Sequence, residues 1–253
     1  MAKLGIIGGT GLDNAQIMKH AKDLDVTTVY GKPSSPLRHG VIDDVEVVLL
    51  SRHGRRHTIP PSQINNRANI DALREQGCSY ILATSACGSL REEIHRGDFV
   101  VPDQFIDFTR HRKVSFFEDF QPGIENARHT PMADPFSEVL RQKLIESAKE
   151  CGLPVHERGT VITIEGNRFS TRAESKMFRA WGADVINMST APEVTLANEA
   201  GLPYGLVAMS TDYDCWKTDE KPVDVAEIIR VFHKNIESVK AILLTVIPKV
   251  GRL

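Results

Sequence analysis

The sequence has 253 residues, of which 41% are hydrophobic, 25% charged and 6% aromatic, the composition of a globular protein with enough apolar side chains for a sizeable core. This composition excludes a disordered or fibrous chain. The 31 Lys and Arg residues against 33 Asp and Glu residues leave a formal charge of −2, which excludes a bulk attraction to nucleic acid or to an anionic membrane. An anionic ligand would therefore have to be held by a local site.

The apolar runs and the cysteines bear on location and metal binding. The longest apolar stretches, such as residues 242–247, are far shorter than the roughly 20 residues needed to cross a bilayer, and the first residues show no cleavable signal pattern. A cytoplasmic location is the default expectation. The cysteines lie far apart without a Cys-x-x-Cys pair, which disfavours a zinc cage or a disulfide framework and favours reduced structural thiols. They are Cys78, Cys87, Cys151 and Cys215.

Short apolar runs alternate with amphipathic segments along the chain. Buried strands are predicted at residues 4–7, 45–50, 80–84, 99–101, 161–163, 185–188 and 205–210. Helices are predicted at residues 63–76, 136–151, 190–200 and 223–246; the third opens with a capping box of Thr190 and Glu193, and Pro248 halts the last. This alternation predicts an α/β fold, a single domain over residues 1–253 with a central mixed β-sheet flanked by helices. Residues 105–135 are expected to form long loops.

The first predicted strand runs into the sequence Gly-Gly-Thr-Gly at residues 8–11. Glycines there let backbone N–H groups approach an anion, and Thr10 adds a hydroxyl donor. A dinucleotide fingerprint would need a third glycine where Asn14 stands, and no Gly-Lys-Ser/Thr follows for a P-loop. The segment predicts a phosphate cradle, with a tight turn that binds nothing as the open alternative.

A basic run follows the second predicted strand. It contains the guanidiniums of Arg52, Arg55 and Arg56 and the imidazoles of His53 and His57. Arginine offers a planar fork of donors suited to phosphate, and ligands of α/β sheets gather beyond the carboxyl ends of the strands. The zinc motif H-E-x-x-H is incomplete, because glycine takes the place of its glutamate. A solvated basic loop is the alternative.

Three further segments carry polar groups. Residues 84–89 form a predicted small-residue turn whose hydroxyls and amides could reach a ligand, and its Cys87 is more readily a buried structural thiol than a nucleophile. Phe169 follows another strand, where its ring could stack on a base. Asp212 and Asp214 follow the strand at 205–210, where carboxylates could accept from an exocyclic amine or share a proton with a ring nitrogen. A capping or turn motif is the alternative for these two acids.

Taken together, six motifs closely resemble the 5′-methylthioadenosine phosphorylases of the trimeric purine nucleoside phosphorylase family. They occur in the same order and at similar spacing, from Lys3 to about Gly251. The motifs lie at residues 8–11, 52–54, 85–89, 165–170, 187–193 and 211–216. Asn167 stands where the family usually has Pro and Ser189 where it often has Thr; neither change removes a ligand group.

The resemblance implies phosphorolysis, in which inorganic phosphate attacks C1′ of the nucleoside and releases adenine and 5-methylthioribose 1-phosphate. The residues that it implies for phosphate are Thr10, Arg52, His53, Ser85, Ala86 and Ser189. Those for the nucleoside are Cys87, Gly88, Phe169, Ser170, Asn187, Met188, Asp212 and Asp214, with Met188 along the sugar. Val225 and Ile228 would form apolar walls for the methylthio group, and His129 would come from a neighbouring subunit. For Val225 and Ile228, an ordinary place in a helix core is the alternative.

Asp212 and Asp214 are the expected catalytic residues. A purine leaves poorly unless N7 is protonated, so an acid with a raised pKa suits Asp212, while Asp214 supports recognition of the amino group. In the resembling family, Asp at the position of Asp212 accompanies a preference for adenine, and Asn there accompanies a preference for 6-oxopurines. The rival interpretations are a purine nucleoside phosphorylase acting on adenosine or 6-oxopurine nucleosides, and a non-catalytic nucleoside-binding module. The resemblance also implies a homotrimer and no metal or organic cofactor.

Overall fold

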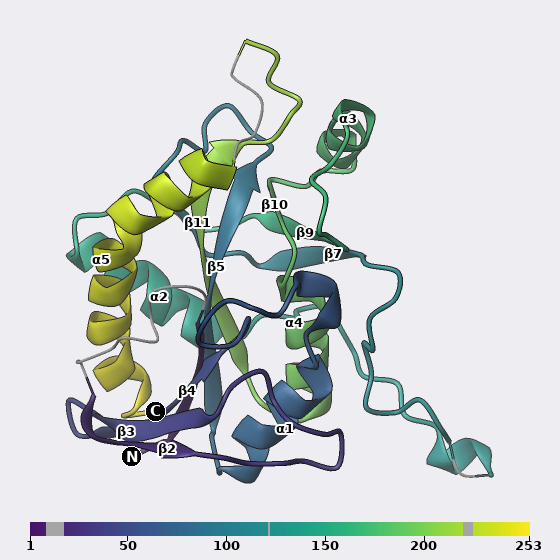
Figure 1. Cartoon of the computed structure of the whole chain (residues 1–253), viewed down its shortest axis with the longest axis vertical. Coiled ribbons are helices and arrows are strands. Elements are labelled where there is room, and N and C mark those ends of the chain that lie inside the picture. Colours follow the sequence, from purple (N-terminus) through teal and green to yellow (C-terminus); the bar gives the residue numbers. More distant parts are fainter. Residues whose placement is uncertain (9–17, 121, 220–224) are drawn as a thin grey trace.

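The computed structural model describes residues 1–8, 18–120, 122–219 and 225–253, which form an α/β structure around one mixed sheet (Figure 1). The strands are β1 (Leu4–Gly8), β2 (Lys19–Leu24), β3 (Leu37–Ile42), β4 (Val45–Ser51), β5 (Tyr80–Ser89), β6 (Phe99–Val100), β7 (Gln104–Phe108), β8 (Val155–His156), β9 (Thr160–Ile164), β10 (Val185–Asn187) and β11 (Tyr204–Tyr213). The α-helices are α1 (Asn66–Glu75), α2 (Glu138–Glu150), α3 (Arg172–Ala180), α4 (Thr190–Glu199) and α5 (Val225–Val250). Short 3₁₀ turns lie at Pro61–Gln63 and Ile124–Asn126.

Strand β5 joins the two parts of the sheet. The strand order is β2-β3-β4-β1-β5-β10-β9-β7, and β11 pairs along the other edge of β5. Strands β4, β1, β5 and β11 run parallel, so their carboxyl ends meet at one edge of the sheet. Strand β10 runs antiparallel to β5, so its carboxyl end points back along β5. This geometry brings the motifs after these strands together and confirms the predicted α/β class.

Helices cover both faces of the sheet, because the central strands are apolar on both sides. Helices α2 and α5 contribute Leu140, Leu144 and Ile242 to the core on one face. Helices α1 and α4 contribute Ile70 and Val194 to the core on the other (Figure 1). Among the helices of the described residues, none combines the length and apolarity needed to span a bilayer.

Several predicted boundaries were wrong. The small-residue turn at 84–89 is the second half of β5, and Asp212 lies inside β11 and not after it. Pro248 does not halt α5, which continues to Val250. A proline lacks only its own N–H donor, and helical hydrogen bonding resumes after it, with the Gly251 N–H donating to the Ile247 carbonyl at 2.9 Å. The loop expected at 105–135 begins with most of β7. Strands β2, β3 and β8 and helix α3 were not predicted. Strand β2 is exposed, β8 has two residues, Arg-His-Gly interrupts the apolar residues of β3, and α3 buries only two of its residues.

Candidate active site

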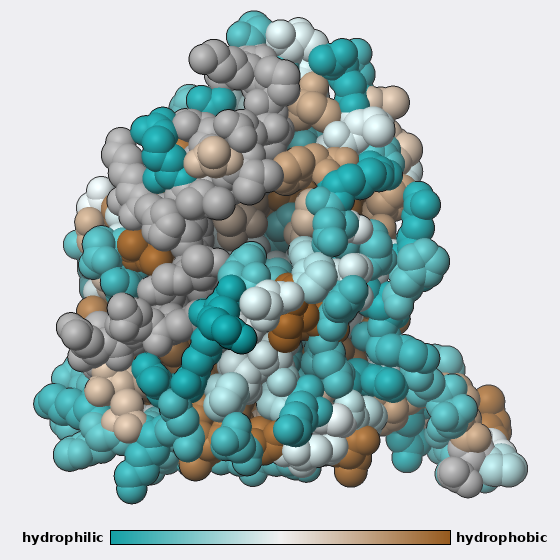
Figure 2. Space-filling model, viewed as in Figure 1, coloured by the Kyte–Doolittle hydropathy of each residue, from teal (hydrophilic) through white to brown (hydrophobic). Residues whose placement is uncertain are grey.

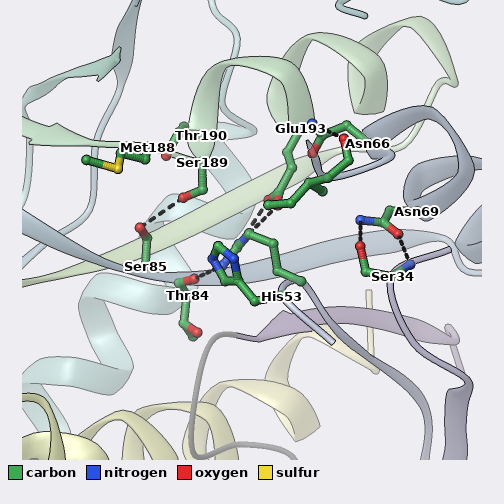
Figure 3. A network of polar contacts seen from close by, with 12 residues as sticks. Ser34, His53, Asn66, Asn69, Thr84, Ser85, Met188, Ser189, Thr190 and Glu193 are labelled. Atoms are coloured by element: carbon green, nitrogen blue, oxygen red, sulfur yellow. Dashed lines mark hydrogen bonds and ion pairs between the residues drawn. The ribbon is translucent and has the colours of Figure 1, made fainter. Parts of the chain in front are cut away.

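Arg52 follows β4 directly and is buried at the carboxyl edge of the sheet. Its Nε and Nη2 both donate to the carboxylate of Glu193 in the first turn of α4, and its Nη1 donates to the carbonyl of Thr84 at 2.9 Å (Figure 3). The Tyr204 hydroxyl donates to the same carboxylate at 2.8 Å. Burial disfavours the charge of Arg52, but Glu193 outweighs burial and raises the pKa of the guanidinium. Arg52 therefore stays charged while much of its donor fork is held by the protein.

The ion pair with Glu193 corrects the predicted capping box. Helix α4 has Ser189 as its N-cap, without a capping hydrogen bond from that side chain. The Glu193 carboxylate binds Arg52 and Tyr204 instead of a backbone amide. A capping box does occur at the start of α3, formed by Thr171 and Glu174.

His53 is a neutral imidazole beside Arg52. Its Nδ1 lies 2.9 Å from the carbonyl oxygen of Ile59, and a carbonyl only accepts, so Nδ1 carries the proton. Burial, together with the charge of Arg52, lowers the pKa of His53 to about 4. At neutral pH its Nε2 is therefore an acceptor, suited to a protonated oxygen of an anion.

The remaining side chains of the basic run do not converge with Arg52. The Arg55 guanidinium points to Asp23 on β2, with Nη1 to Oδ2 at 2.7 Å, and Arg56 is exposed. The His57 ring packs on that of His53 with centroids 4.5 Å apart. The candidate anion site therefore draws one arginine from this run, and not three.

Ser85 and Ser189 meet because β10 returns along β5. Their hydroxyl oxygens lie 3.1 Å apart (Figure 3). Asn187 Nδ2 donates to Ser85 Oγ at 3.1 Å. Ser189 also stands at the N-terminus of α4, the end of a helix that favours negative charge. Ala86 follows Ser85 on β5, and Thr10 lies outside the described residues. The structure thus brings Arg52, Ser85 and Ser189 to one place.

The second half of the site lies where β5 and β11 end. Asp212 and Asp214 are both buried there, and the Ser170 hydroxyl donates to Asp214 Oδ2 at 2.5 Å. The Thr211 hydroxyl donates to Asp212 Oδ1 at 2.7 Å. Burial raises the pKa of Asp212 to about 6, with a further contribution from Asp214 and opposition from the Thr211 hydrogen bond. Asp212 can therefore hold a proton close to neutral pH.

Gly88 leaves room for the Asp212 carboxyl. A Cβ at Gly88 would lie 3.2 Å from Asp212 Oδ2 and 3.1 Å from Ile186 Cγ2, tighter than ordinary contact. The neighbouring Cys87 side chain is buried, and burial raises the pKa of its thiol. A thiol held in its protonated form is a poor nucleophile, in agreement with the predicted structural role.

Phe169 and Met188 border the space between these two halves. Phe169 lies on the loop between β9 and α3 and is 39% exposed, so its ring is accessible to a ligand. Met188 packs against Gly166, where a Cβ would come within 2.7 Å of its Sδ. The roles predicted for these two side chains in binding the nucleoside stay predictions.

Arg112 is a site-supporting residue that the sequence interpretation missed. Its buried guanidinium donates from Nη1 to the Met188 carbonyl at 2.6 Å, from Nη2 to the Ile164 carbonyl at 3.2 Å, and from Nε to Glu165 at 3.1 Å. It therefore ties the ends of β9 and β10 together. No local pattern pairs Arg112 with Glu165, because 53 residues separate them.

Three predicted site residues stand apart from the groups described above, one because of its place in the fold and two because their side chains lie outside the described residues. His129 lies in an arm, defined here as residues 119–132, that projects from the body with the 3₁₀ turn Ile124–Asn126 near its tip, at the lower right of Figure 1. Its ring is exposed and lies in a T-shaped arrangement with the ring of Phe120, with the two ring centroids 5.8 Å apart. Val225 and Ile228 lie in the first turn of α5, but their side chains are outside the described residues. Within the described part of the chain, no three His, Cys, Asp or Glu residues are grouped to hold a metal.

The chain matches known proteins over nearly its full length. Residues 3–248 match the model of the Phosphorylase superfamily. S-methyl-5'-thioadenosine phosphorylases from Danio rerio and Xenopus tropicalis are 52% and 51% identical to it, over 99% of this chain and 90% of each relative. A solved structure of methylthioadenosine phosphorylase from Schistosoma mansoni in complex with adenine is 43% identical with a TM-score of 0.92, over 100% of this chain and 93% of that one. The chain therefore belongs to the phosphorylase superfamily and, within it, to the family of the S-methyl-5'-thioadenosine phosphorylases.

Proposed function

We propose that this protein catalyses the phosphorolysis of 5′-methylthioadenosine to adenine and 5-methylthioribose 1-phosphate. The observation that carries this function is the placement of a protonatable buried acid, Asp212, at the same sheet edge as the polar cluster of Arg52, Ser85 and Ser189. Ser85 and Gly88 are three positions apart along β5, about 10 Å of strand, which gives room for a sugar between an anion and a base. Two solved structures support the substrate class: the Schistosoma mansoni enzyme in complex with adenine, and a mutant of that enzyme in complex with methylthioadenosine.

Phosphate is the nucleophile in this reaction. The Ser85 and Ser189 hydroxyls and the remaining N–H groups of Arg52 would hold it, and neutral His53 Nε2 would accept from its protonated oxygen. Positive charge builds on the sugar as the glycosidic bond breaks, and an oriented dianion beneath C1′ stabilises that charge and captures the carbon. The protein needs no covalent nucleophile of its own, and we propose no metal or organic cofactor.

Asp212 and Asp214 divide the work on the base. Asp212 would give its proton to N7, so that adenine leaves as a neutral molecule. Ser170 holds Oδ2 of Asp214, and Oδ1 would accept from the exocyclic amine. The 6-oxo group of hypoxanthine would place an acceptor against this carboxylate, and a mispaired buried polar group costs about 1–3 kcal/mol.

The fuller site is proposed to form in a homotrimer. Phe120 and Ile124 of the arm are 48% and 89% exposed, and such apolar side chains at a projecting tip favour contact with another chain. The space-filling view shows apolar atoms gathered at this tip (Figure 2). His129 would then reach the site of a neighbouring subunit.

The four cysteines are free thiols, which supports the proposed cytoplasmic location.

Release of free base from methylthioadenosine, adenosine and 5′-methylthioinosine, each with and without inorganic phosphate, tests this proposal. We expect phosphate-dependent release of adenine, fastest from methylthioadenosine. Release without phosphate would indicate a hydrolase and overturn the roles of Arg52 and His53. Preferential release of hypoxanthine would overturn the role of Asp212, and binding without release would favour a nucleoside-binding module.

A further inference from the structure

A β-bulge places the Thr211 hydroxyl beside the carboxyl of Asp212. Along β11, Ser210 pairs with Cys87 of β5 and Asp212 pairs with Gly88, so Thr211 is the extra residue of the bulge. In a regular strand, consecutive side chains point to opposite faces of the sheet. The bulge removes this alternation, and Thr211 Oγ1 lies 2.7 Å from Asp212 Oδ1.

The Thr211 hydroxyl has one proton and two acceptors within reach. The Cys87 carbonyl oxygen lies 3.2 Å from Oγ1, and Asp212 Oδ1 lies 2.7 Å from it. Thr211 is 1% exposed, so bulk water does not compete for this proton. The shorter contact assigns the proton to Oδ1. An oxygen that accepts this bond is not the one that carries the acidic proton, which places that proton on Oδ2.

Among the described residues, the other charged and titratable groups that face Asp212 come from three segments. Asp214 follows it along the chain and raises its pKa, whereas Arg96, in the loop before β6, lowers it. Cys87 on β5 is a thiol whose own pKa is raised by burial and by Asp212. Burial has the largest effect on the pKa of Asp212, and the Thr211 hydrogen bond is the strongest influence against it.

We propose that Thr211 is a positioning residue for the leaving-group acid, because its hydroxyl keeps the transferable proton of Asp212 on Oδ2 and stabilises the carboxylate that remains. This inference rests on the proposed function. As the C1′–N9 bond breaks, its electron pair goes to the purine, the proton on Oδ2 moves to N7, and Asp212 becomes a carboxylate. The bond from Thr211 to Oδ1 is then charge-assisted and roughly twice as strong. Because this hydrogen bond strengthens as the proton leaves, it lowers the free-energy barrier to cleavage of the C1′–N9 bond.

The pH profile of kcat for phosphate-dependent adenine release by the full chain tests this role. Thr211→Val keeps the β-branched shape and removes the hydroxyl. We expect kcat to fall about tenfold, and the decline of activity at high pH to move upward by up to about one pH unit, because the acid form persists when the carboxylate loses its donor. Thr211→Ser keeps the hydroxyl and should restore the wild-type profile.

Ser210→Ala is the matched control. The Ser210 hydroxyl is buried on the same strand, and within the described residues it has no hydrogen-bond partner, so its removal should leave the pH profile unchanged. If Thr211→Val does not fold, Thr211→Ala carries the same prediction, since it also lacks the hydroxyl.

The outcomes separate this inference from the function on which it rests. An active wild-type protein whose Thr211→Val variant loses rate without a displaced profile would overturn the role of Thr211 alone. The same conclusion would follow if Thr211→Ser behaved like Thr211→Val. A wild-type protein that releases no adenine would overturn the proposed function, and the role of Thr211 with it.

Discussion

Asp212 is expected to act on base preference together with Asp214. Asp212→Asn cannot donate an acidic proton to N7, and general acid catalysis contributes typically about 10²–10⁴-fold, so we expect kcat/KM for methylthioadenosine to fall within that range. The asparagine amide can donate to a 6-oxo group, so kcat/KM for 5′-methylthioinosine should fall less than kcat/KM for methylthioadenosine. Rates of base release from the two nucleosides give the ratio of their kcat/KM values in the variant and in wild type. An unchanged ratio would contradict the role of Asp212 in choosing the base.

The same substitution should stabilise the fold at neutral pH. The pKa of Asp212 rises from an ordinary 3.8 to about 6, so its contribution to stability is fully present below about pH 4 and is lost as the pH rises through about 6. This displacement corresponds to about 3 kcal/mol at most. In urea at pH 7.5, the free energy of unfolding should therefore be larger for Asp212→Asn than for wild type. At pH 4 the two values should differ little. An equal gain at both pH values would argue against ionisation as the cause.

The pair of Arg52 and Glu193 is expected to support the fold as well as the anion site. Glu193→Gln leaves the buried Arg52 charge without its counter-ion, and such a loss typically costs about 3–5 kcal/mol. The free energy of unfolding in urea measures this. Replacing both residues by Met should cost less than Glu193→Gln alone, because no buried charge then remains. A double variant less stable than Glu193→Gln would refute this explanation.

At the scale of elements, Arg112 holds the ends of β9 and β10 in place. Arg112→Met removes donors from the carbonyls of Ile164 and Met188, so the segment with Met188 and Ser189 should open more readily. We expect faster amide exchange in residues 186–190 and a higher KM for the nucleoside. Arg110→Met is the matched control, because the Arg110 side chain is exposed and its contact with Glu165 runs through the backbone amide. Equal effects of the two substitutions would exclude this role for Arg112.

At the scale of the whole molecule, the arm should decide assembly. Wild-type protein should have about three times the 28.1 kDa mass of one chain in light scattering. Ile124→Arg places a charge at an apolar contact and should shift the mass toward one chain, with a loss of activity as His129 leaves the neighbouring site. Val139→Ser, at a 51% exposed position on α2, should keep the wild-type mass. A single-chain mass for the wild type would contradict the homotrimer.

Local patterns in the sequence were sufficient for the alternation of strands and helices and for the composition of both halves of the site. Short apolar runs between amphipathic segments favour buried strands of a covered sheet, although the run at 242–247 lies in helix α5. The parallel order then puts the carboxyl ends of β4, β5 and β11 at one edge. Ser85, Asp212 and Asp214 were therefore predicted from their own segments before their contacts were known, whereas Ser189 was implied by the family resemblance alone. The roles assigned to them in catalysis stay predictions until the substitutions above are made.

Only the tertiary structure decided the partners of Glu193, Arg112 and Thr211. A Thr-x-x-Glu pattern is equally compatible with a capping box and with the ion pair to Arg52, which lies 141 residues away. The bulge at Thr211 depends on the register of β11 against β5, and a single-residue change in register turns every side chain to the other face. Strand order and register are set by packing over the whole molecule. For that reason the sequence determined which chemistry is present, and the fold determined which groups touch.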